Sequence, residues 1–307
     1  MLARYPQAVP GGMMETALSI LMEGLIDYAG LYPPASLGMD TATRNYAAYR
    51  KGHQAEWLGR FVLPVARLKE FSAARATLPA GTWKLAALIG TDPVLDLSQL
   101  AEFNRAGFLY AEPAARIDTL EMKADRPSDI ARVLEAAPDD VIAYFEIPLA
   151  DPGHCLAELA RLGGRAKLRT GGVTPDRIPS SAEAAAFVAA CAAARVPLKA
   201  TAGLHHPFRS LRPLTYAPDS PKAMMHGFVN VFLAAAFATQ GAPAAELEAL
   251  LDETSPQAFR FTSDGVQWRN RRIDAESLRR ARGDFAIAFG SCSFEEPRQD
   301  LREAGWL

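Results

Sequence analysis

The stretch that decides the fold is residues 166–206, AKLRTGGVTPDRIPSSAEAAAFVAACAAARVPLKATAGLHH. It opens with a short, mostly apolar run at residues 166–172 and closes with a second at residues 197–204. Between the two runs, residues 181–194 are rich in alanine and other strong helix formers. Strand, helix and strand in this order form a βαβ unit, whose two strands lie parallel in one sheet.

The same alternation runs through the rest of the chain and predicts eight strands. We expect them at residues 25–31, 61–65, 84–89, 107–112, 141–147, 166–172, 197–204 and 285–290. Eight strands that alternate with helices favour an α/β fold, the (β/α)8 TIM barrel, as one domain over residues 1–307. The alternative is an open doubly wound sheet, which needs a glycine-rich first turn where this chain has Tyr-Pro-Pro at residues 32–34.

Two segments fall outside the regular alternation. Residues 1–12 contain two prolines and a glycine pair, which predicts an N-terminal arm. Residues 207–284 form an insertion between the seventh and eighth strands. Within it we expect a proline-containing loop, a long helix at residues 222–239 and a small hairpin at residues 259–272.

Composition excludes several classes of protein. The chain has 307 residues, 49% of them hydrophobic, and a formal net charge of −2, which suits a globular domain and indicates neither a nucleic-acid partner nor a membrane surface. Three cysteines without a CxxC pair (Cys155, Cys191 and Cys292) argue against a disulfide framework and for a reducing cytoplasm. We expect no signal peptide, and the most apolar segment, residues 228–238, is too short to span a bilayer. That segment is apolar all round, so it either packs beneath the insertion or forms a subunit contact in a homo-oligomer.

Active-site residues in such barrels come from the C-terminal ends of the strands. Alternate side chains of a strand face the same side, so Lys167 shares a face with Arg169, and Lys199 with Thr201. If the sixth and seventh strands are neighbours, the two lysines converge. A desolvated lysine beside a second cation is the usual source of an amine nucleophile at neutral pH, because like charges disfavour the protonated form of each amine.

Four motifs resemble those of deoxyribose-phosphate aldolases, in the same order along the chain. Residues 167–171, Lys-Leu-Arg-Thr-Gly, resemble that family's Lys-Thr-Ser-Thr-Gly, and residues 199–203, Lys-Ala-Thr-Ala-Gly, resemble its Lys-Ala-Ser-Gly-Gly. Residues 290–293, Gly-Ser-Cys-Ser, resemble the Gly-Thr-Ser-Ser turn, and residues 25–33 are similar to the opening Ile-Asp-His-Thr-Leu-Leu-Lys-Pro. The chain departs from the family at Arg169, where the family has a small residue. It also shows no counterpart of the family's acid/base aspartate on a middle strand.

The resemblance implies a class I aldolase-like lyase that acts on a small anionic carbonyl compound or a sugar phosphate without a cofactor. Lys167 would form the Schiff base and Lys199 would tune it. Glu146 or Glu112 would move protons, and Asp27 completes the catalytic set. The residues expected to bind substrate are Arg169, Thr170, Thr201, Gly203, His205, Gly290, Ser291, Ser293 and Tyr32.

Other interpretations of the same residues remain open. His205 and His206, with His226, Glu112 and Glu146, could hold a divalent metal in a lyase, isomerase or hydrolase. A non-catalytic barrel that binds a ligand is a further alternative. Single residues also have structural readings: Arg169 could neutralise Glu146, residues 291–293 could cap the last helix, and Cys292 could be a buried thiol.

Overall fold

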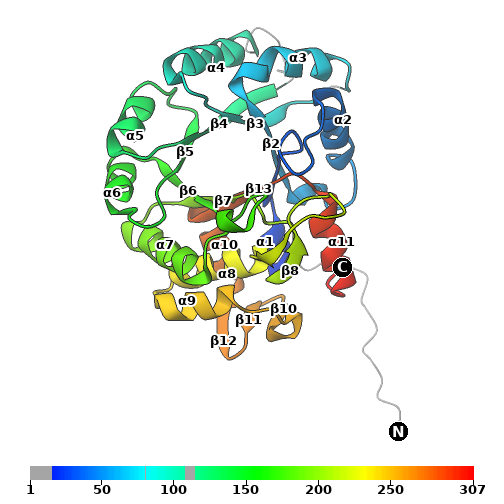
Figure 1. The fold of residues 1–307 in the computed structure, drawn as a ribbon, viewed down its shortest axis with the longest axis vertical. Coiled ribbons are helices and arrows are strands. Elements are labelled where there is room, and N and C mark those ends of the chain that lie inside the picture. The colour runs from blue at the N-terminus through cyan, green and yellow to red at the C-terminus, as the bar shows by residue number, and fades with distance from the viewer. Residues whose placement is uncertain (1–15, 80, 108–114) are drawn as a thin grey trace.

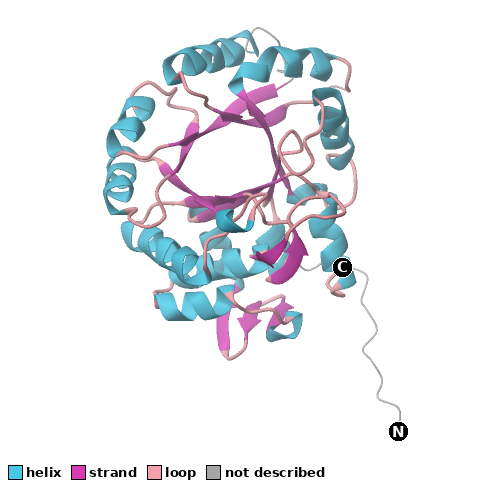
Figure 2. Cartoon of the chain, in the orientation of Figure 1, coloured by secondary structure: helices cyan, strands magenta, loops and turns pink. Residues whose placement is uncertain are grey.

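The computed structural model describes residues 16–79, 81–107 and 115–307. Eight parallel strands close into a barrel in the order β1-β13-β7-β6-β5-β4-β3-β2, with helices around the outside (Figures 1 and 2). The predicted (β/α)8 barrel is therefore confirmed. Its strands are β1 (Ile26–Tyr28), β2 (Leu58–Pro64), β3 (Trp83–Leu88), β4 (Ala115–Lys123), β5 (Ile142–Glu146), β6 (Arg165–Arg169), β7 (Leu198–Thr201) and β13 (Ala286–Ser291).

Helices follow the strands and cover the barrel from outside (Figure 2). They are α1 (Ala17–Met22), α2 (Met39–Tyr49), α3 (Leu68–Ala76), α4 (Pro93–Gly107), α5 (Pro127–Leu134), α6 (Gly153–Leu162), α7 (Ser181–Ala194), α8 (Phe228–Ala238), α9 (Ala244–Leu251), α10 (Ala275–Asp284) and α11 (Glu295–Glu303). Short 3-10 turns lie at Ala55–Trp57, Val65–Arg67, Pro175–Arg177 and Pro256–Ala258. The start of α7 shows why these helices begin where they do. Ser180 accepts a hydrogen bond from the N–H of Glu183, whose carboxylate bonds back to the N–H of Ser180 in a capping box.

Strand register sets the height of each side chain in the barrel. Lys167 of β6 lies directly opposite Lys199 of β7, and it also pairs with Glu146 of β5. Parallel strands with matched register point their inward side chains at one level of the lumen. The predicted convergence of the two lysines is therefore confirmed at the level of the backbone.

The fourth strand lies further along the chain than predicted. We expected it at residues 107–112, but Gly107 ends α4, and residues 108–114, including Glu112, lie outside the described residues. The strand is Ala115–Lys123, which alternates apolar and charged side chains for most of its length and shifts register against β3 after Ile117. This correction moves the carboxylate of Glu121 to the end of a barrel strand.

The insertion contains more β-structure than predicted. β8 (Ser210–Pro213) lies where a loop was expected and β9 (Lys222–Met225) where a long helix was expected to start; the two form an antiparallel hairpin, and α8 begins only at Phe228. Gly227 lies between β9 and α8, where a Cβ would come within 2.3 Å of the carbonyl oxygen of Pro207. The hairpin predicted at residues 259–272 has a third strand, and its sheet runs β10 (Phe259–Thr262), β11 (Gly265–Trp268) and β12 (Arg271–Asp274).

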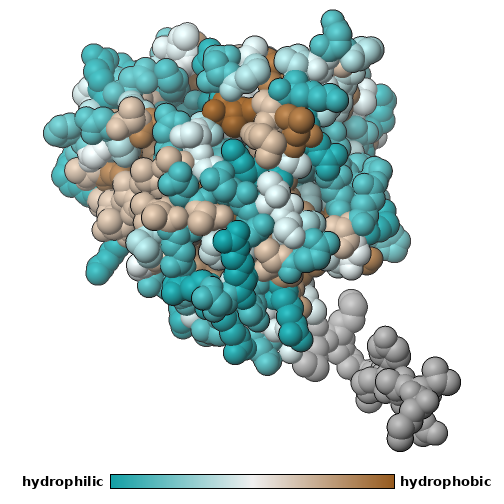
Figure 3. All heavy atoms as spheres, turned by 60° about the horizontal axis from the view of Figure 1, so that its bottom comes forward, coloured by the Kyte–Doolittle hydropathy of each residue, from teal (hydrophilic) through white to brown (hydrophobic). Residues whose placement is uncertain are grey.

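The all-apolar helix α8 is buried on every side, between α7, α9, α10 and β13. Its one polar side chain, Asn230, is satisfied by the backbone: it donates to the carbonyls of Leu250 and Glu253 and accepts from the N–H of Arg209. Of the two expectations for this segment, the structure shows the internal packing. The face drawn in Figure 3 is mostly hydrophilic, with a few hydrophobic groups gathered in its upper half. No helix within the described ranges is long and apolar enough to cross a bilayer.

Candidate active site

Four charged side chains meet inside the barrel, and we call them the charged quartet: Lys167, Glu121, Lys199 and Asp27. Lys167 Nζ donates to Glu121 Oε2 at 2.6 Å, and Lys199 Nζ donates to the other oxygen of the same carboxylate. Lys199 Nζ also donates to Asp27 Oδ2 at 2.6 Å. Cations and anions therefore alternate along one hydrogen-bonded row, in which both ammonium groups share the carboxylate of Glu121.

The quartet is almost dry. Asp27 and Lys199 are each 1% exposed, Glu121 is 3% exposed and Lys167 is 6% exposed. Such burial is costly for a lone charge, but every charge here has an opposite partner within hydrogen-bond distance. Lys167 and Glu121 border the cavity at the barrel mouth, whereas Lys199 does not line it. Of the two lysines of the quartet, Lys167 is therefore the one that a ligand in this cavity can reach.

The electrostatics of Lys199 differ from the expectation that a neighbouring lysine would favour its neutral form. Burial alone would lower the pKa of Lys199, but Asp27 and Glu121 raise it above its usual value. Burial alone would raise the pKa of Glu121, but Lys167 and Lys199 lower it to about 2. In the resting site at neutral pH, Lys199 is therefore a cation and Glu121 an anion.

Asp27 is held from the other side by the backbone of β2. Its Oδ1 accepts a hydrogen bond of 2.6 Å from the N–H of Arg60. Gly59 makes this approach feasible, because a Cβ at that position would lie 2.3 Å from Asp27 Oδ1. With both oxygens bonded, Asp27 acts as an anchor for Lys199 and does not border the cavity.

The cavity above the quartet has a volume of about 500 Å³. At its rim, Arg169 and Glu146 form a two-pronged ion pair, with Nε to Oε1 at 2.8 Å and Nη2 to Oε2 at 3.2 Å. This confirms the alternative that Arg169 neutralises Glu146. The Arg169 side chain remains 43% exposed, so the guanidinium can also meet a ligand.

The structure brings only some of the predicted binding residues to this cavity. Those that line it are Tyr32, Arg169, Thr201, Gly203, His205 and Gly290. Three predicted residues do not line it, because their hydroxyls bond within the protein. Thr170 donates to the carbonyl of Ala202, Ser291 donates to that of Ser293, and Ser293 Oγ accepts from the N–H of Glu296 in the first turn of α11. Ser293 thus has the capping role that was its alternative.

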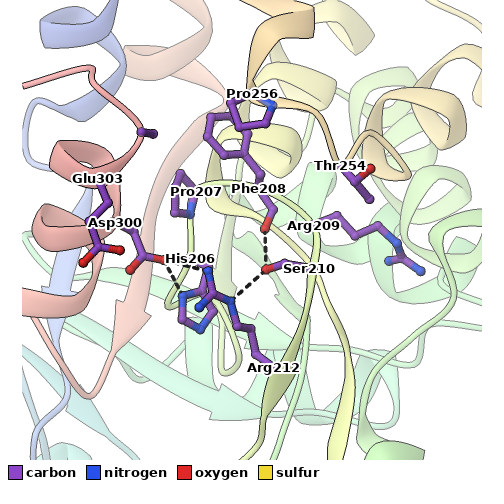
Figure 4. A pocket seen from close by; sticks show the side chains of 11 residues that line it. His206, Pro207, Phe208, Arg209, Ser210, Arg212, Thr254, Pro256, Asp300 and Glu303 are labelled. Carbon is purple, nitrogen blue, oxygen red and sulfur yellow. Dashed lines mark hydrogen bonds and ion pairs between the residues drawn. The ribbon is translucent and has the colours of Figure 1, made fainter.

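The three histidines of the metal alternative do not converge. His205 pairs with Glu296 through Nδ1 at 2.8 Å, and His226 bonds the carbonyl of Pro179 through Nε2. His206 points to Asp300, at 2.6 Å, in a separate cavity of about 220 Å³ (Figure 4). In the part of the chain that the structure describes, no three His, Cys, Asp or Glu side chains are grouped as a metal site requires.

Tyr32 and Cys292 also line the cavity, and each carries a polar group with a proton, a hydroxyl and a thiol. The hydroxyl of Tyr32 is buried and has no hydrogen-bond partner in the described structure. Burial and then the charge of Glu121 raise the pKa of Tyr32, so this hydroxyl keeps its proton. Burial raises the pKa of Cys292 to about 11, which makes its thiol a poor nucleophile at neutral pH.

Sequence reasoning missed Glu121, the residue that joins the two lysines. The signal that could have found it is the alternation in Ala115–Lys123, where Asp118, Glu121 and Lys123 interrupt an apolar pattern within a strand. We compared the sequence with models of protein families and with curated proteins, and neither comparison gave a match.

Proposed function

We propose that this protein is a class I lyase that forms a Schiff base through Lys167 with a small anionic carbonyl compound. The observation that carries the proposal is the charged quartet at the base of the cavity. It presents one lysine to a ligand and keeps a second, permanently charged lysine beside it. The resemblance to deoxyribose-phosphate aldolases in the two lysine motifs supports the same assignment.

The chemistry begins with proton transfer inside the quartet. Lys167 gives a proton to Glu121, and the free amine attacks the carbonyl carbon of the substrate. The attacking nitrogen passes one of its protons to the carbonyl oxygen, and the resulting hydroxyl leaves as water when it takes up a second proton and the nitrogen lone pair forms the iminium. Glu121, bonded to Lys167 at 2.6 Å, is placed to return the proton to the departing oxygen. It replaces Glu112 and Glu146 as the proposed proton carrier.

The iminium then accepts the electron pair of the bond between its α and β carbons, while the β-hydroxyl gives its proton to water and that fragment leaves as a carbonyl compound. The enamine that remains takes a proton from water at carbon, and hydrolysis of the resulting iminium releases the product from Lys167. Lys199 supports these steps by position, since its hydrogen bond fixes the carboxylate of Glu121 beside Lys167. Arg169 supplies a fork of donors for a carboxylate or phosphate at the rim.

Reductive trapping tests the proposal. The protein is incubated with pyruvate, a simple anionic carbonyl compound, and sodium cyanoborohydride, and the adduct is located by mass spectrometry of peptides. We expect one adduct at Lys167, its loss in Lys167→Arg, and its retention in Lys69→Arg, which changes an exposed lysine of α3. Absence of an adduct in the unaltered protein, or an adduct that persists in Lys167→Arg, would overturn the proposal.

A further inference from the structure

The mouth of the cavity is divided into two arcs of opposite character. One arc follows β4, β5 and β6, whose ends carry Lys123, Glu146 and Arg169. The other follows β3, β2 and β1, where Leu88, Val62 and the two prolines after Tyr32 line the cavity. Because the barrel order is β1-β13-β7-β6-β5-β4-β3-β2, each arc is continuous and the arcs lie on different sides of the mouth.

The insertion adds to the apolar side of the cavity. Leu214, just after β8, and Met225, at the end of β9, line the cavity and are only 3% and 4% exposed. The hairpin is closed by a hydrogen bond from the N–H of Leu214 to the carbonyl of Pro221. Tyr216 lies in the loop between β8 and β9, and its hydroxyl is 3.7 Å from Sγ of Cys292, which directly follows β13. The insertion is therefore built into the wall of the cavity.

The charges of the mouth follow the same division. Arg169 and Lys123 lie on the β4–β6 arc, and Arg177, from the 3-10 turn after β6, lines the cavity beside them. One acid at the rim, Glu146, is already paired with Arg169. An anionic group is therefore favoured on this side, whereas the opposite side is apolar apart from the hydroxyl of Tyr32.

We infer that the substrate is a carbonyl compound with an anionic group at one end and an apolar body, aromatic or branched aliphatic, at the other. This inference rests on the proposed function, because it places the carbonyl over Lys167 between the two arcs. A cavity of about 500 Å³ lies within the range of pockets that enclose drug-sized ligands, which is larger than a three-carbon oxo acid needs. The hydroxyls of a sugar would find no hydrogen-bond partners on the apolar wall besides the hydroxyl of Tyr32, whereas each apolar group buried against it contributes to the binding free energy.

Two oxo acids that differ only in the apolar group provide the test. Pyruvate and phenylpyruvate are trapped separately at Lys167 with cyanoborohydride, and the concentration that gives half-maximal labelling is measured for each. Burying a phenyl group is worth roughly 1.5–3 kcal/mol, so we expect phenylpyruvate to saturate at about ten- to a hundredfold lower concentration. Leu214→Asn and Met225→Gln should each reduce this preference severalfold. Circular dichroism shows whether each variant is folded.

Leu211→Asn is the matched control, because Leu211 lies on the same hairpin with its side chain 60% exposed. It should leave both labelling curves unchanged. Equal saturation by the two acids overturns this inference and leaves the Schiff base in place. A preference for phenylpyruvate that survives in both cavity variants overturns the assignment of the wall. Failure of both acids to label the unaltered protein overturns the proposed function, and the inference with it.

Discussion

Replacement of Lys199 with methionine tests the charged quartet directly. Methionine has nearly the same length, so the main loss is one buried ammonium group that bonds Asp27 and Glu121. Removing one partner of a buried ion pair costs about 3–5 kcal/mol, because the remaining charge stays buried without compensation. Asp27 keeps the N–H of Arg60, and Glu121 keeps Lys167, so we expect the lower end, about 3 kcal/mol at pH 7.5.

The loss of unfolding free energy in Lys199→Met should also depend on pH. Without Lys199, the pKa of the buried Glu121 carboxyl rises, and the folded variant binds a proton that its unfolded chain does not. The deficit in unfolding free energy should therefore shrink between pH 7.5 and pH 5. Urea unfolding followed by circular dichroism measures it at both values. Lys69→Met, on the exposed surface of α3, is the control and should stay within about 0.5 kcal/mol. A deficit below about 1 kcal/mol that is the same at both pH values would refute the reasoning.

Three further substitutions probe other features of the site. The pKa of Glu121 is lowered from 4.5 to about 2, so its contribution is complete above pH 4.5 and is lost as the pH falls towards 2. The shift corresponds to about 3 kcal/mol of unfolding free energy. Glu121→Gln should therefore flatten the dependence of the unfolding free energy on pH over this window, as measured by urea unfolding, and an unchanged dependence would contradict this role of Glu121. Tyr32→Phe removes a buried hydroxyl that has no partner in the described structure, so unfolding free energy should rise by up to about 1 kcal/mol, and a clear loss would reveal a missed partner. Gly171→Ala places a Cβ 2.9 Å from Gly203 Cα, so urea unfolding should show that the unfolding free energy falls by about 2 kcal/mol. Gly283→Ala in α10, with open space around it, is the control and should be neutral or stabilising. Equal effects of the two substitutions would argue against the contact.

The barrel could be predicted because its hydrophobic pattern is dictated by burial on two faces. β6 and β7 are short, mostly apolar runs separated by a strongly helical segment, and the register of the structure places their lysines opposite each other. The boundaries of α7 agree with the helical segment predicted at residues 181–194, because the capping box at Ser180 begins the helix. The β8–β9 hairpin was missed, because four residues before a long apolar helix carry too little pattern to separate strand from helix.

One member of the charged quartet, Glu121, was missed because its strand departs from the usual pattern of a buried strand. A parallel strand buried on both faces should be apolar throughout, but β4 contributes Glu121 to the lumen and Asp118 to an ion pair with Arg60. The sequence of β4, which carries Glu121, therefore looks less like a buried strand than the apolar residues before it, and residues 107–112 were predicted as the strand instead. Local sequence rules fail where function demands a buried charge. Asp27 was found because its strand is otherwise apolar, but its pairing with Lys199 joins residues 172 positions apart and leaves no local signal.

The arrangement of charges also bears on which state of Lys167 the site favours. With Lys167 protonated, the quartet holds two cations and two anions and is neutral. Transfer of the Lys167 proton to Glu121 leaves Lys199 and Asp27 as the only charges, so the carboxylate that both ammonium groups need is lost for that moment. In the mechanism that we propose, the iminium restores a positive charge at the same nitrogen, and Glu121 regains its charge when it returns the proton. The proposed Schiff base would therefore regain the ion pair with Glu121 that the free amine lacks, and the quartet would stabilise the intermediate that accepts electrons from the breaking C–C bond.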